Sequence, residues 1–208
     1  MAQTPTQVTS RRGRPASFDR DDVLDKAMRV FWEKGYASAS MSDLTTAMGI
    51  ASPSIYAAFG SKEGLYREAL DRYVALSREG LARILELPTA RESVEGLLLK
   101  AVAAFSRSGV PSGCMLEQTV AEIGDQSPEL AESLGKMRAV NDANFLARLR
   151  KGVEEGDVAP GTDIAAVAAF YITVRKGLSL TAKGGASPDE MRSVVASAMT
   201  AWAALTGS

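Results

Sequence analysis

The stretch MSDLTTAMGIASPSIYAAFGSKEGL, residues 41–65, decides the fold of the N-terminal part of the chain. It contains two apolar pieces, each too short to be an ordinary helix, which are joined at Gly49 and Ile50. Two short helices connected by a tight glycine turn are the pattern of a helix-turn-helix, in which the start of the second helix enters the major groove of DNA. Small helical domains also use short capped helices for packing, so the spacing alone leaves both interpretations open.

The residues in front of this turn predict where the first two helices begin and end. Asp19 can be the N-cap of an apolar helix that ends at Gly35, because glycine readily adopts the left-handed conformation that closes a helix. Ser40 can cap the next, short helix, with Asp43 at the third position reaching back to complete a capping box.

The residues after the turn carry similar signals. Ser52 is expected to be the N-cap of the second short helix, with Pro53 at its first position, where a missing N–H group costs nothing. Gly60 ends that helix, and Ser61 can cap a long fourth helix that we expect to continue to about Leu85.

The rest of the chain is a series of longer helical patterns separated by glycine and proline. The breaks lie near Pro88 and at residues 109–113, 124–128, 156–161 and 184–188. The sequence therefore predicts an all-α protein of about nine helices. We expect a flexible basic arm at 1–17, a three-helix module with the helix-turn-helix pattern at 18–62, and a larger helical domain at 63–208.

Composition limits the function. The 208-residue chain is 46% hydrophobic, has a net charge of −1, and contains one cysteine and no histidine. The missing histidine excludes Ser-His-Asp and Cys-His catalysis and removes the commonest zinc ligand, so we expect no enzyme, no metal and no cofactor. Residues 1–15 lack the apolar core of a targeting segment, and no stretch approaches the ~18 apolar residues of a membrane span. We therefore expect a cytoplasmic protein.

Residues 18–70 resemble the N-terminal DNA-binding domain of TetR-family transcriptional regulators. The resemblance is carried by an ordered set of features: Phe31, Gly35-Tyr36, the Ser40 helix start, Gly49-Ile50, Ser54-Ile55-Tyr56, Phe59, and Ser61-Lys62-Glu63 leading to Leu65. The remaining chain is similar to the family only in size and number of helices. The resemblance implies a homodimer, a palindromic operator, and a C-terminal pocket whose small-molecule effector changes DNA affinity, and it favours a repressor.

The resemblance also implies which residues contact DNA. By matching position, these are Ser42, Thr45, Ser52, Pro53, Ser54, Tyr56 and Lys62. Ala57 and Ala58 depart from the larger or polar residues common in the family; they cannot form bidentate base contacts, although they can meet thymine methyl groups. Arg12 and Arg14 are expected to follow the DNA backbone or enter a minor groove; alternatively, they belong to a solubilising tail.

The larger domain supplies candidates for dimerisation and for ligand binding. Apolar residues of the last helices form a stripe that predicts either a dimer interface or ordinary core: Met191, Val195, Met199 and Trp202. Residues that predict a pocket lining, or else ordinary packing, are Phe105, Cys114, Met115, Gln118, Met137, Phe145 and Tyr171. Arg175 is expected to meet an anionic group of an effector; the alternative is a salt bridge within the protein.

Two other functions compete with a ligand-responsive repressor. The short helices could bind protein instead of DNA, which would make the chain a helical adaptor. Cys114, expected in the first turn of a helix, could make the chain a thiol-based sensor of oxidants or electrophiles, because a helix N-terminus stabilises a thiolate. The alternative for Cys114 is a buried small apolar residue.

Overall fold

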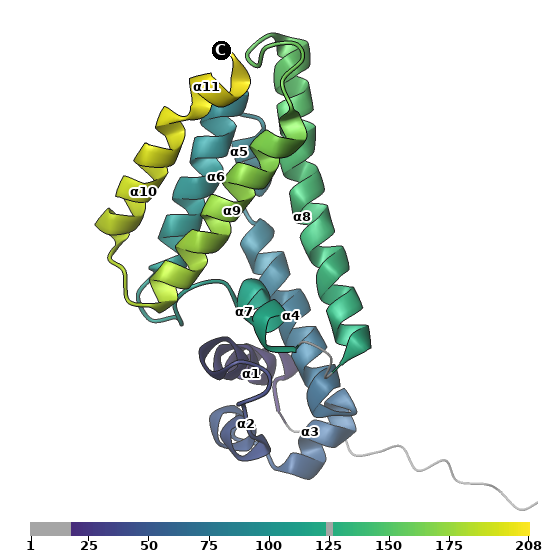
Figure 1. The fold of residues 1–208 in the computed structure, drawn as a ribbon. Helices are drawn as coiled ribbons and strands as arrows, with labels where there is room; N and C mark the ends of the chain where they lie inside the picture. The colour runs from purple at the N-terminus through teal and green to yellow at the C-terminus, as the bar shows by residue number, and fades with distance from the viewer. Residues whose placement is uncertain (1–17, 124–126) are drawn as a thin grey trace, which may run out of the picture.

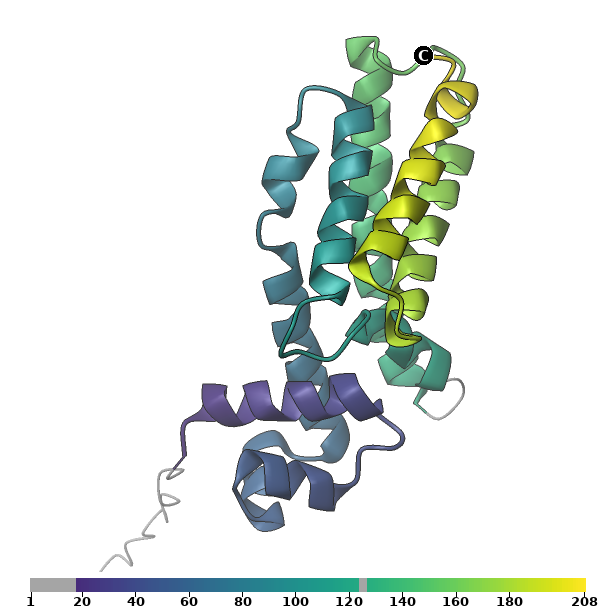
Figure 2. The ribbon, with the colours of Figure 1, turned by 90° about the vertical axis from the view of Figure 1, so that its left-hand side faces the viewer.

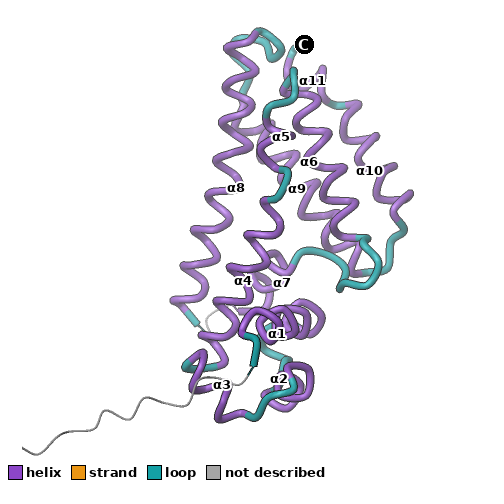
Figure 3. Tube along the Cα trace, turned by 180° about the vertical axis from the view of Figure 1, so that it is seen from behind, coloured by secondary structure: helices purple, strands orange, loops and turns teal. Residues whose placement is uncertain are grey.

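The structure is a computed structural model that describes residues 18–123 and 127–208. Within these ranges all regular elements are α-helices, eleven in number (Figure 3). The all-α prediction is confirmed. The count exceeds the expected nine because two short helices, α5 (Leu81–Leu85) and α11 (Trp202–Thr206), each follow a longer helix. Arg12 and Arg14 lie outside the described residues, so their predicted role stays a prediction.

The first four helices follow the predicted caps closely. They are α1 (Arg20–Lys34), α2 (Met41–Met48), α3 (Ser52–Phe59) and α4 (Lys62–Arg78). Asp19 accepts hydrogen bonds from the backbone N–H groups of Asp21 and Asp22, and Ser61 accepts one from Gly64. Ser40 and Asp43 form the complete capping box.

Two predicted boundaries are wrong. Ala51, not Ser52, is the N-cap of α3, and no side chain caps that helix end. Ser52 is itself helical, so Pro53 occupies the second position. The long fourth helix ends at Arg78 rather than Leu85, because Gly80 adopts a left-handed φ of 73° and starts the separate helix α5 (Leu81–Leu85).

The remaining helices build an elongated bundle above the first three (Figure 1). They are α6 (Ala90–Phe105), α7 (Met115–Ile123), α8 (Pro128–Glu155), α9 (Ile164–Lys183), α10 (Pro188–Thr200) and α11 (Trp202–Thr206). In Figure 2, α1 lies across the lower end of the bundle, while α4 rises from the small module into it. The helix-turn-helix is therefore at the end of the molecule opposite the C-terminus.

One buried core joins the small module to the bundle. The ring of Tyr66 on α4 stands edge-on to Phe31 of α1, and Tyr73 stands edge-on to Trp32, each pair with centroids 4.9 Å apart. α4 also packs against α7. α4 thus contacts elements on both sides of the boundary predicted near residue 62.

Among the described residues, α9 is long and apolar enough to cross a membrane by length and composition alone, which the sequence expectation overlooked. Core helices of soluble proteins pass the same test, so this is weak evidence for a span. Only 28% of the most apolar 18-residue segment of α9 is buried within the chain, so α9 presents much apolar surface outward.

Candidate nucleic-acid interface and effector cavity

The turn between α2 and α3 has the geometry that the sequence predicts. Gly49 adopts the left-handed conformation, with φ 70° and ψ 22°, and its N–H donates to the carbonyl of Thr45. Leu44 and Met48 of α2, and Ile55 and Phe59 of α3, are all buried. These four side chains fix the two short helices against the module core and leave the other face of α3 exposed.

The exposed face of α3 is apolar and uncharged apart from hydroxyl groups. Tyr56 has 48% of its surface exposed, and Pro53 and Ala57 are also exposed. Ser52 and Ser54 are half-buried at the start of the helix. Tyr56 therefore projects from the exposed face of α3, the second helix of the helix-turn-helix.

The neighbouring helix α2 contributes further hydroxyl groups. Ser42 is exposed, whereas Thr45 is half-buried and its hydroxyl donates to the carbonyl of Ser42 at 3.0 Å. Thr46 is exposed and lies one turn after Ser42, on the same side of α2. Thr46 was not among the candidates predicted from the sequence, although its four-residue spacing from Ser42 predicts that the two lie on the same side of the helix.

Lys62 is the one cation between residues 35 and 62. Its Nζ lies 4.8 Å from the centroid of the Tyr36 ring, and burial lowers the pKa of the ammonium group. It forms no ion pair with the described residues. Asp43, the acidic residue of this segment, is instead paired with Lys34 at 2.6 Å. Lys62 is thus held in place by an aromatic ring while its charge remains unneutralised.

A cavity of about 680 Å³ lies between α1, α4, α6, α8 and the loop that joins α6 to α7. Four of the predicted ligand residues line it: Phe105, Cys114, Phe145 and Arg175. Trp32 and Tyr73 also line it and were not predicted, because their spacing indicates only core packing of α1 and α4. The volume is typical of cavities that hold small organic ligands.

The other four predicted ligand residues lie outside the cavity lining. Met115 is buried in the core, and Met137 packs against it. Gln118 accepts a hydrogen bond from Lys183 at 2.6 Å. Tyr171 is fully buried, and its hydroxyl donates to the carbonyl of Ala198 at 3.3 Å. These four side chains therefore belong to the packing between α7, α8, α9 and α10.

Cys114 lies in the wall of the cavity and is 5% exposed. It precedes α7 rather than lying in its first turn, and its N–H donates to Ser179 Oγ at 2.7 Å. Burial, together with the neighbouring Cys114 side chain, raises the pKa of Tyr73 well above its usual value. The phenol is therefore protonated and packed against the thiol.

Arg175 enters the cavity lining from α9 and is paired within the protein. Its Nη2 lies 3.1 Å from Glu117 Oε1, and the other oxygen of Glu117 lies 3.7 Å from Nη2 of Arg138. Two guanidinium groups therefore share one carboxylate. The predicted salt bridge exists, and it leaves one positive charge in excess.

The α6–α7 loop connects this cavity to the small module. Arg29 of α1 donates to the carbonyl of Gly109 at 2.7 Å. The buried indole of Trp32 donates to the carbonyl of Gly113 at 3.1 Å. Because Arg29 and Trp32 also line the cavity, the residues by which α1 holds the α6–α7 loop are part of the cavity wall.

The predicted dimer residues point inward. Met191, Val195, Met199 and Trp202 are all buried within the chain, where α10 and the start of α11 pack on α6 and α9. They form core, the alternative that the sequence left open. The outward side chains of the same flank are different ones: Phe170 and Leu180 of α9 and Val194 of α10.

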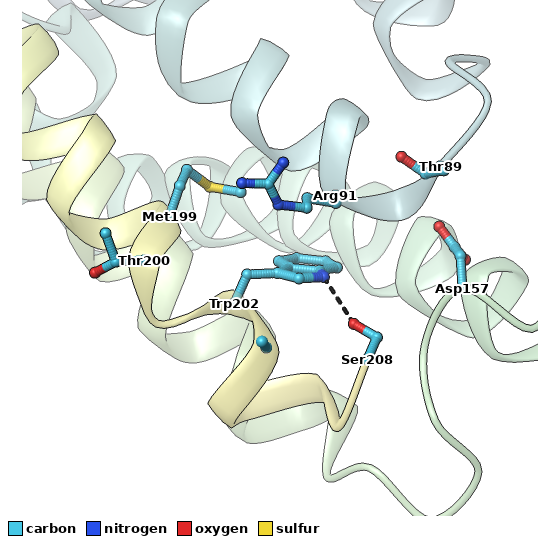
Figure 4. A pocket seen from close by; sticks show the side chains of 8 residues that line it. Thr89, Arg91, Asp157, Met199, Thr200, Trp202 and Ser208 are labelled. Carbon is cyan, nitrogen blue, oxygen red and sulfur yellow. Dashed lines mark hydrogen bonds between the residues drawn. The ribbon is translucent and has the colours of Figure 1, made fainter.

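A second hollow of about 400 Å³ lies at the opposite end of the bundle (Figure 4). Trp202 donates to Ser208 Oγ at 3.1 Å there, and Arg91 lies beside the indole. Asp157 accepts from the backbone N–H of Ala90 and so caps the start of α6. These contacts fix the C-terminal turn and the loop after α8, far from the helix-turn-helix.

Both parts of the chain match models of known protein families. The family model "Bacterial regulatory proteins, tetR family" matches residues 23–69, and "Tetracyclin repressor-like, C-terminal domain" matches residues 90–198. The transcriptional repressor ComR of Escherichia coli K12 is 33% identical over 97% of this chain and 98% of its own length. BdcR, a repressor of the same organism, is 30% identical over 89% of this chain and 90% of its own.

A solved structure adds a DNA complex to these relatives. A cysteine mutant of the TetR-family transcriptional regulator CifR was solved with 26-bp double-strand operator DNA, and it is 42% identical to this chain. The TM-score is 0.86, and the match covers 91% of this chain and all of that one (100%).

Proposed function

The chain belongs to the tetR family of bacterial regulatory proteins, and from this premise we propose that it is a repressor that binds a palindromic operator as a homodimer and leaves it when a small molecule binds. Its relatives are transcriptional regulators, and ComR and BdcR are named as repressors. The observations that carry the proposal are the uncapped start of α3, the exposed Tyr56 on that helix and the unneutralised Lys62 at the start of α4.

In this proposal the contacts to DNA are mostly to phosphate. Tyr56 donates its hydroxyl to one phosphate, and Lys62 binds another at the start of α4. Ser42, Thr45, Ser52 and Ser54 are short donors to phosphate or base edges. Pro53 and Ala57 offer apolar contact to thymine methyl groups, so base selection rests on few residues and on the shape of the DNA.

The outward apolar flank supports a homodimer. α9 and α10 lie side by side on one flank of the bundle (Figures 1 and 2). Leu180 is 75% exposed and Val194 is 48% exposed on this flank. Apolar side chains concentrated on two adjacent helices are suited to pairing with a second copy, which would also account for the membrane-like composition of α9.

The cavity supports release by an effector. A ligand that fills it touches α1 directly, because Arg29 and Trp32 are part of its wall. A ligand that prefers a different position of α1 shifts the population of dimers away from the orientation that fits successive major grooves.

Footprinting on the DNA upstream of the gene, titrated with salt and competitor DNA, tests the DNA-binding part. We expect protection of an inverted repeat, and Lys62→Ala should weaken binding and reduce the salt slope by about one. The matched control is Lys136→Ala, since Lys136 is an exposed lysine of α8 paired with Glu132. Equal salt slopes for the two variants would remove Lys62 from the interface.

Sedimentation tests the dimer. Leu180→Asp should shift the protein toward monomer, because a charge would be placed within the apolar flank. Leu99→Asp, on an exposed position of α6, is the control and should leave the assembly unchanged. A wild-type monomer at all concentrations would refute the homodimer.

A further inference from the structure

We propose that the cavity selects an amphipathic organic anion, with its charged head at Arg175, Asn141 and Asn144 and its apolar body against Trp32 and Phe105. This inference rests on the proposed effector role of the cavity and adds the chemical class of the ligand. It is carried by the charges, the free amides and the apolar wall of this cavity.

The charges that line the cavity are strongly unbalanced. Six cationic side chains line it, against two carboxylates: Arg29, Arg78, Arg83, Lys100, Arg107 and Arg175, with Asp25 and Glu79. One of the two carboxylates, Asp25, is already neutralised by Arg72, with one N···O distance of 2.8 Å. The whole chain has a net charge of −1, so this positive potential is local and attracts anions to the cavity.

Arg175 brings part of this positive charge into the half-buried wall, where it shares the carboxylate of Glu117 with Arg138. The side chains of Arg175, Glu117 and Arg138 are 23%, 12% and 29% exposed, so their shared charge is partly withdrawn from water. Glu117 engages only one nitrogen of Arg175, while a guanidinium group carries five N–H donors. The remaining donors can bind a carboxylate or sulfonate, and such charge-assisted hydrogen bonds are strong in a partly dry site.

Two amides add further polar groups to the cavity wall. Asn141 and Asn144 line the cavity from α8, three residues apart and therefore on the same side of the helix. Within the part of the chain that the structure describes, neither side chain has a hydrogen-bond partner in the protein. Their NH₂ groups are donors that an anionic head can use without displacing an existing contact.

The rest of the wall is apolar and aromatic. Met28, Trp32, Leu97, Phe105 and Phe145 line it, and the volume of about 680 Å³ accommodates a fused aromatic or medium-length aliphatic body. A hydrophilic anion such as inorganic phosphate would leave this wall unfilled. A cationic ligand would bring its charge close to Arg175 and Lys100.

A matched pair of fluorescent probes tests the inference on the full-length protein without DNA. 1-Anilinonaphthalene-8-sulfonate carries an anionic head, whereas N-phenyl-1-naphthylamine has the same aromatic body without it. We expect the sulfonate to bind about tenfold more tightly, the factor that corresponds to one charge-assisted hydrogen bond. Arg175→Met should abolish this preference while leaving the affinity for the neutral probe unchanged.

Controls locate the binding and separate the two proposals. Ala104→Trp, at an exposed position of the cavity lining, should weaken both probes, whereas Arg91→Met at the distant hollow should weaken neither. If Arg175→Met does not fold, Asn144→Leu takes its place: it should lose the preference for the sulfonate and keep the affinity for the neutral probe. Equal affinity of the wild type for the two probes, or an equal loss of both in the variant, overturns the inference. Operator footprinting of the same proteins without probe reports separately on the proposed DNA binding.

Discussion

Replacing Gly113 by alanine tests whether the α6–α7 loop is held by close packing. Gly113 has a φ of 81°, and a Cβ there would lie 2.8 Å from the carbonyl oxygen of Ser179 and 3.1 Å from Nε2 of Gln118. The first of these contacts is with backbone, which cannot rotate away. Gly109, in the same loop, has a φ of 78° but nothing within 4 Å of the corresponding Cβ.

The two glycines therefore separate two costs. Gly109→Ala should lose stability only because a residue with a Cβ is placed in the left-handed backbone conformation, at a cost of about 1–2 kcal/mol. Gly113→Ala bears the same cost and an added overlap that we place at about 1–3 kcal/mol, as for overpacking in cores. For a chain of this length each kcal/mol lowers Tm by roughly 2–4 °C. Gly113→Ala should therefore melt about 2–12 °C below Gly109→Ala.

Thermal and urea unfolding of the two variants measure this difference. We also expect weaker operator binding for Gly113→Ala, because the displaced loop carries the carbonyl that accepts from Trp32 of α1. If the two variants lose the same free energy of unfolding, the loop is not packed against α9 as the structure has it.

Three further changes test the N-terminal caps and the buried polar contacts. Ser40→Ala should destabilise the protein by about 1 kcal/mol in urea unfolding, because α2 loses its cap; the exposed neighbour Ser38→Ala should have almost no effect. The Lys34 hydrogen bond, then those of Ser40, hold the pKa of Asp43 well below its usual range. The stability that wild type gains over Asp43→Asn should therefore be constant above about pH 5, and shrink as the pH falls below the ordinary carboxyl pKa of ~3.9; a constant difference down to about pH 2 would contradict this. Arg148→Met should cost about 3 kcal/mol, since the buried guanidinium donates to Ser93 Oγ at 2.9 Å and to the Leu87 carbonyl at 3.0 Å. The exposed Arg150→Met is its control, and equal unfolding midpoints would refute the role of Arg148.

Short-range signals explain why the small module was predictable. Asp19, Ser40 and Ser61 cap the helices that follow them, since a side-chain oxygen meets a backbone N–H only two or three residues away. The prediction that Ser52 is an N-cap was wrong because a serine at the N-cap and a serine at the first helical position cannot be distinguished in the sequence. The predicted end of α4 was wrong because apolar residues lie on both sides of Gly80, at Leu76 and Leu81, and only the conformation of Gly80 shows that the helix stops.

Long-range contacts explain why the cavity and the dimer flank were less predictable. An apolar stripe in the sequence predicts which side of a helix is buried, but not which other element covers that side. Met199 and Trp202 therefore matched an interface as well as a core, and only the packing of α10 on α6 and α9 distinguishes the two. The sequence likewise predicts only that Trp32 lies in the core of the small module. In the structure Trp32 also lines a cavity to which helices far along the chain contribute.

From the position of α1 we expect the two proposed sites to be energetically linked. Trp32 is buried against Tyr73 and donates to the α6–α7 loop, while Phe31, its neighbour on α1, packs on Tyr66 in the core of the small module. α2 in turn packs on α1, and α3 packs on α2 and α4. We therefore expect a ligand in the cavity that changes the preferred position of Trp32 to change the free energy of each orientation of the α2–α3 pair. By linkage, DNA that fixes this orientation must change the affinity for the ligand by the same factor.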